Sequence, residues 1–173
     1  MTEGDAGATA PYTEATRARV VMAYEACELA DLARAAVPIG EHELCSDGTV
    51  RSPGAVLADA VQVLRAAHRF LEAAAVSERL GGAGWARVGE VLGVPPQTAR
   101  ACFAAAEARF REELRSPEGA AARCWRACMA GHPLEAARDL DDWVLRHADG
   151  DRDLGPAPVS GGLVRRDQAA VRR

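Results

Sequence analysis

The sequence predicts an all-α protein, a helical bundle in which two long antiparallel N-terminal helices precede an embedded helix-turn-helix. Alanine is abundant, and hydrophobic residues make up 49% of the 173 residues while aromatic residues make up only 5%. Alanine is the best helix former, and the β-branched runs that favour strands are missing. Apolar residues also recur at three- and four-residue steps over long stretches, which is the helical period. These observations predict close-packed helices and no sheet.

The first long helix is expected over residues 14–37, after a small, polar and acidic tail at residues 1–13 that should be disordered. Pro38 and Gly40 should stop this helix, because proline lacks a backbone N–H and glycine commonly ends helices. Its apolar side chains predict one buried face. The members of that face are Val20, Tyr24, Cys27, Ala30, Ala33 and Val37.

A second long helix is expected to begin at Ser52 and Pro53, an N-cap residue followed by a residue suited to the first helical turn. It should continue to about Leu80, and two such helices joined by a loop form an antiparallel pair. Its apolar residues alternate in steps of four and three, which is a heptad-like seam. The seam predicts contact with another helix, either within one chain or between two chains. Its members are Leu57, Val61, Leu64, His68, Leu71 and Ala75.

The most informative stretch is a helix-turn-helix pattern over residues 85–106. Val88 faces the core of this unit, and Gly89 leaves room for the second helix to cross closely. Gly93 ends the first helix, where a residue with positive φ is needed. Pro96 lies in the opening turn of the second helix, which should run to about residue 115. Two helices joined by such a turn can place the second helix in the major groove of DNA.

Two short stretches carry a resemblance to a known family. They are Gly-Trp-Ala-Arg-Val-Gly at residues 84–89 and Leu-Gly-Val at residues 92–94. They resemble the helix-turn-helix of small, poorly characterised actinobacterial DNA-binding proteins, in which a tryptophan-led helix and Leu-Gly-Val recur. This chain departs from that pattern at Pro96, where an arginine is usual, which removes one expected DNA contact. The resemblance implies a DNA-binding module and does not imply a particular target.

Four side chains are the candidates for DNA contact. Gln97, Thr98 and Arg100 should lie on the outer face of the second helix, where glutamine bonds adenine, arginine bonds guanine and threonine reaches either a base or a phosphate. Arg87, on the preceding helix, is placed to clamp a phosphate. One recognition helix reads only a few base pairs, so the regulator should act as a homodimer on double-stranded DNA. Alternatively, the unit is an ordinary helical corner whose polar side chains face water.

The rest of the chain completes a single helical domain over residues 14–148. Further helices are expected from Ser116 to near Gly131 and from Leu134 to about His147, on either side of the His132-Pro133 break. Residues 149–173 are rich in glycine, proline and charge, and they should form a flexible tail.

Composition and charge disfavour several classes of function. The net charge is −4, whereas a dedicated non-specific DNA binder would be basic, so that class of protein is disfavoured. No apolar run is long enough to cross a membrane, and the N-terminus lacks the regions of a signal peptide, which predicts a cytoplasmic protein. Nucleotide-binding and hydrolase motifs are missing, so we expect no enzyme and no cofactor. The alternative function is a helical protein interaction module, such as an adaptor or an RNA polymerase-associated factor, in which the helix-turn-helix is only a scaffold.

The cysteines leave a thiol or metal site open. Cys124, Cys128 and His132 lie at i, i+4 and i+8, and the loop residues His42 and Cys45 are possible further ligands. Such a set suits zinc binding or thiol-based sensing, but no Cys-x-x-Cys pair occurs, and free cysteine is often a small buried hydrophobe. The apolar spacing predicts that the remaining two cysteines, Cys27 and Cys102, lie in the core.

Overall fold

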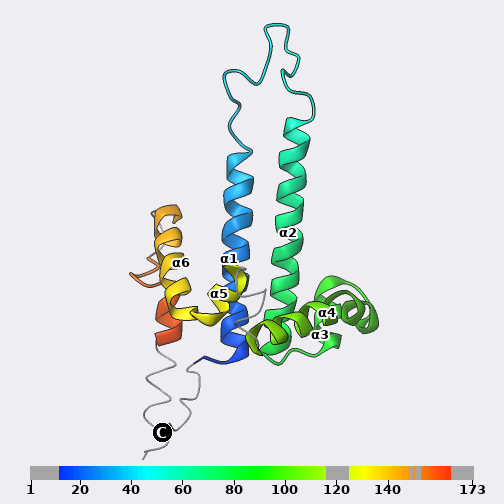
Figure 1. Cartoon of the computed structure of the whole chain (residues 1–173), viewed down its shortest axis with the longest axis vertical. Coiled ribbons are helices and arrows are strands. Elements are labelled where there is room, and N and C mark those ends of the chain that lie inside the picture. Colours follow the sequence, from blue (N-terminus) through cyan, green and yellow to red (C-terminus); the bar gives the residue numbers. More distant parts are fainter. Residues whose placement is uncertain (1–11, 116–124, 149, 151–152, 165–173) are drawn as a thin grey trace, which may run out of the picture.

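The computed structural model describes residues 12–115, 125–148, 150 and 153–164, and these residues form helices and no β-strand, which confirms the all-α prediction. Helices α1 (Glu14–Ala35) and α2 (Ala55–Leu80) stand side by side as a long antiparallel arm (Figure 1). The other helices gather around the base of this arm, two beside α2 and two beside α1. They are α3 (Trp85–Leu92), α4 (Pro96–Arg115), α5 (Trp125–Gly131) and α6 (Pro133–His147).

The two arm helices begin in different ways. The Thr13 Oγ1 atom accepts the Thr16 backbone N–H at 3.2 Å, a side-chain N-cap that starts α1 close to the expected position. The predicted start of α2 at Ser52 and Pro53 is wrong, because the helix begins only at Ala55. Its N-cap is Gly54, whose φ of 93° lies in the left-handed region. This backbone conformation turns the chain away from the helix axis, so the two preceding residues lie outside the helix.

The base of the arm holds the hydrophobic core. One cluster joins α1, α2, α4 and α5, and a second joins α1 to α6. Many of the buried side chains are alanines, which let helices approach closely and explain how so few aromatic residues suffice. The first cluster contains Ala18, Val21, Val76, Ala106, Phe110 and Ala130.

A buried carboxylate ties three helices together beside this core. Glu25 of α1 is fully buried, and its Oε2 atom lies 3.2 Å from Nε of Arg69 on α2. Its Oε1 atom lies 3.4 Å from Nε of Arg126 on α5. A charge removed from water is costly unless it is paired, so the two arginines offset the cost of burying Glu25.

The predicted apolar seam of α2 does not close within the chain over most of its length. Leu57, Leu64 and Leu71 are exposed to 69%, 56% and 42%, and Val61 and His68 are also exposed. We call these five residues the leucine face. The buried side of α2 instead carries Ala66, Ala73 and Val76, and the predicted seam meets the core only at its last member, Ala75.

The geometry of a helix explains this difference. Ala66 and Ala73 each follow a seam leucine by two residues, which is a rotation of about 200° around the helix axis. The side that packs in the folded chain therefore lies nearly opposite the leucine face. Small alanines mark it, and a pattern search weighted toward large apolar residues selects the other side.

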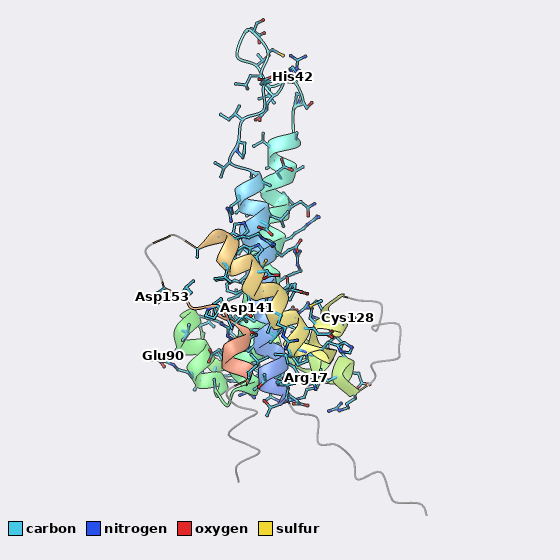
Figure 2. All side chains as sticks on the ribbon, turned by 90° about the vertical axis from the view of Figure 1, so that its left-hand side faces the viewer. Arg17, His42, Glu90, Cys128, Asp141 and Asp153 are labelled. Atoms are coloured by element: carbon cyan, nitrogen blue, oxygen red, sulfur yellow. The ribbon has the colours of Figure 1, made fainter. Side chains whose placement is uncertain are left out.

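The prediction of a flexible tail over residues 149–173 is wrong for residues 153–164. Asp141 of α6 accepts the backbone N–H groups of Val159 and Ser160 at 2.6 and 3.0 Å, and it also accepts the Ser160 hydroxyl (Figure 2). Val159 packs against the α1–α6 cluster. The buried carboxylate caps the short helical turn that begins at Ser160. The segment packs against α6 because these backbone donors find an acceptor there.

Several predictions fall partly outside the described residues. Residues 1–11 of the expected N-terminal tail and residues 165–173 of the expected C-terminal tail are among them, as are residues 116–124 of the expected fifth helix. Within the described part of the chain, no helix combines the length and the apolar character that crossing a membrane would require.

Candidate nucleic-acid interface

Helices α3 and α4 form the predicted helix-turn-helix, and two glycines set its geometry. Gly93 has a φ of 68° and ends α3, as expected for a left-handed helix terminus. A Cβ atom on Gly89 would lie 2.6 Å from the Val94 carbonyl oxygen and 3.2 Å from the Pro96 nitrogen. The Gly89 carbonyl also accepts the Val94 N–H at 2.9 Å. The turn therefore crosses directly over Gly89, and only glycine fits there.

An arginine that the sequence did not reveal holds this unit on the arm. The Arg79 guanidinium, near the end of α2, stacks 4.3 Å from the ring centroid of Trp85 at the start of α3. Its Nε atom donates to Glu107 of α4 at 3.2 Å, and its Nη1 atom donates to the Ala83 carbonyl. Three helices meet at this one side chain, so the helix-turn-helix is positioned relative to α2 at its base.

The structure brings Gln97, Thr98 and Arg100 together in the first turns of α4, and all three are exposed. The buried side of α4 begins at Ala99. On a helical projection Gln97 points away from that side, while Thr98 and Arg100 lie on opposite flanks. The outward face then continues through exposed small residues, which the sequence reading did not include. They are Ala101, Ala105 and Ala108.

Of the two candidate arginines at this surface, one is already paired with a carboxylate. Arg87 is exposed on α3, but its Nη1 atom lies 2.8 Å from Oε2 of Glu90 one turn later. The hydrogen bond and the charge of Glu90 raise the pKa of Arg87. Arg100 makes no hydrogen bond or ion pair with any residue that the structure describes. Arg100 is therefore the candidate cation that is ready to meet a phosphate or a base.

The described members of the suggested thiol or metal site do not come together. Figure 2 shows His42 at the tip of the arm and Cys128 at its base, so the loop residues cannot complete a site on α5. Cys124 lies outside the described residues, and among those described no group of three or more potential ligands gathers. The prediction that Cys102 lies in the core is wrong, because its side chain is exposed on α4.

Cys27 is half-buried against the α1–α6 cluster, as its spacing predicted in part. Burial and the nearby carboxylates of Asp31 and Glu28 raise the pKa of the Cys27 thiol to about 11. The thiolate is the reactive form of cysteine. This residue is therefore a packing residue and a poor nucleophile at neutral pH.

The chain matches no protein-family description, no curated protein sequence and no solved structure. The resemblance to actinobacterial helix-turn-helix proteins thus stays a prediction, based on the residues of α3 and the turn.

Proposed function

We propose that the protein is a sequence-specific DNA-binding transcriptional regulator that acts as a homodimer in the cytoplasm and has no enzymatic activity. One observation carries the proposal. The turn over Gly89 and Gly93 has the close crossing that a helix-turn-helix requires, and the start of α4 is exposed with Gln97 at its centre. The N-terminal residues of the second helix are the ones that contact base edges in such modules.

Each exposed residue is suited to a different contact with DNA. Gln97 has the amide pair that bonds adenine bidentately, and the methyl group of Ala101 suits contact with a thymine methyl group. Arg100, on one flank, reaches a guanine or a phosphate. Thr98 lies on the other flank and can reach a phosphate. Arg87 binds a phosphate only after its ion pair with Glu90 breaks. Because phosphate contacts supply most of the sequence-independent affinity, the protein should bind DNA weakly outside its specific sites.

The DNA affinity of variants, measured by fluorescence anisotropy with DNA from the chain's own promoter, tests these assignments. Genome-wide immunoprecipitation of the tagged protein would supply further sites. Replacing Arg100 with alanine should reduce the free energy of binding to the specific DNA site by about 1–3 kcal/mol and relax the sequence preference at one base pair. Replacing Arg87 with alanine should weaken binding to all DNA sequences alike. It should also lower the slope of log affinity against log salt concentration by less than about one unit, because Glu90 already offsets the charge of Arg87.

Glu90→Gln gives the sharpest test, since it removes the partner that holds Arg87. DNA affinity should rise for all sequences, and the salt slope should increase by up to about one unit. Glu41→Gln makes the same charge change in the exposed loop of the arm and is the matched control. If Glu90→Gln changes affinity no more than Glu41→Gln does, the helix-turn-helix is not the DNA-binding surface.

A protein interaction module is the second candidate function, and two observations favour it. Val91 is exposed to 71% on α3, and Arg87 is already paired with Glu90. A surface that combines exposed apolar side chains with balanced charge suits a protein partner. If the wild-type protein binds neither genomic fragments nor its own promoter at low salt, this function replaces DNA binding.

A further inference from the structure

We infer that the leucine face of α2 is where a second copy of this chain docks, by parallel coiled-coil pairing of the two α2 helices. The inference deepens the proposed function, because it assigns the dimer interface and its orientation. Leu57, Leu64 and Leu71 are spaced by seven residues, and Val61 and His68 fall between them at the other heptad position. Leucine at the d position, with Val61 at an a position, favours two-stranded parallel pairing.

The large hydrophobic side chains that the folded chain leaves exposed are concentrated on the arm. Of the thirteen in the described residues, nine lie between residues 37 and 71. Four of these nine, Leu57, Val61, Leu64 and Leu71, belong to the leucine face. Exposed apolar side chains that gather on one face of a helix mark an interaction site. The opposite side of α2 is already occupied by α1. The leucine face is therefore a second, unused packing surface on the same helix.

The flanks of the leucine face suit a second copy of the same helix. Ala60 and Ala67 line one edge, and Ala58 and Arg65 line the other. In a parallel pair the two edges meet, so Arg65 of one chain lies near Ala60 of the second chain. Small residues there allow the helices to approach closely, and no like charges are brought together.

Electrostatics and function both favour the parallel orientation. Arg65 is one residue from Leu64, the middle of the leucine face, so an antiparallel pair would bring two Arg65 side chains together. A parallel pair also places both helix-turn-helix units at the same end of the dimer, because each follows the C-terminal end of its α2. This second argument rests on the proposed function, since two recognition helices must reach one stretch of DNA.

The molar mass of the full chain in solution, measured by sedimentation without DNA, tests the interface independently of DNA binding. The wild-type protein should be a dimer. Leu64→Arg should weaken dimerisation by more than about 100-fold, because unpaired guanidinium groups would be buried in the interface. Leu145→Arg is the matched control, since Leu145 is exposed to 46% on α6, and it should remain a dimer.

A wild-type monomer at high micromolar concentration would overturn the inference, and so would a Leu64→Arg variant that dimerises like Leu145→Arg. Circular dichroism should show equal helicity in both variants. His68→Leu provides a second test that does not risk unfolding. A polar residue at an a position lowers coiled-coil stability, so this variant should dimerise more tightly. An unchanged or weaker dimer would contradict the interface.

Mild oxidation of a Leu57→Cys variant tests the orientation. In a parallel dimer the two introduced thiols face each other and should form a disulfide, which peptide mass mapping identifies. In an antiparallel dimer centred on Leu64 they would lie about 21 Å apart along the helix axis and could not join. A dimer in which this disulfide is absent would refute the parallel arrangement, and loss of DNA binding alone would not affect this result.

Discussion

The close crossing of the turn over Gly89 makes a specific stability prediction for Gly89→Ala. The added Cβ atom would lie 2.6 Å from the Val94 carbonyl oxygen, well inside ordinary contact distance. The obstructing atoms are backbone, so a rotamer change cannot relieve the clash. Overpacking of this kind typically costs about 1–3 kcal/mol. Alanine recovers up to about 1 kcal/mol through its better helix propensity.

The free energy of unfolding should therefore fall by about 1–2 kcal/mol, measured by urea denaturation followed by circular dichroism. For a chain of this size the melting temperature should fall by about 2–8 °C. Gly131→Ala is the matched control, because nothing lies within 4 Å of the Cβ position at Gly131 in α5. If Gly89→Ala is as stable as the wild-type protein, the turn does not have the tight geometry described here.

Two further substitutions test the buried carboxylates by urea denaturation and hydrogen exchange. Glu25→Gln leaves Arg69 and Arg126 without their buried counter-charge, so it should lower the free energy of unfolding by about 2–4 kcal/mol, whereas Glu135→Gln on the exposed side of α6 should have almost no effect. Asp141→Asn should speed hydrogen exchange at the two backbone amides that the carboxylate accepts, by roughly ten- to a hundredfold, while the amides of α2 exchange as before. Equal stability of the two glutamate variants would contradict the first prediction, and unchanged exchange at both amides would contradict the second.

Local signals in the sequence were sufficient for the helices and the turn. Alanine content and helical periodicity predicted an all-α chain, and the end of α3 and the start of α4 follow from Gly93 and Pro96. The reason is physical: a left-handed glycine or a proline in a first helical turn acts within a few residues, whatever the rest of the chain does. The candidate residues Gln97, Thr98 and Arg100 were correctly expected to be exposed because that expectation depended only on the register of α4.

The tertiary structure alone decided which surfaces meet. Periodicity identified an apolar stripe at Leu64 but could not show that alanines on the opposite side of α2 would take the core, because both stripes satisfy the same helical period. Nor could one sequence show that Glu90 offsets Arg87, that Arg79 joins three helices, or that Asp141 holds the C-terminal segment. These are side-chain contacts, most of them between distant segments, and their partners are set by how the helices pack and not by the local sequence.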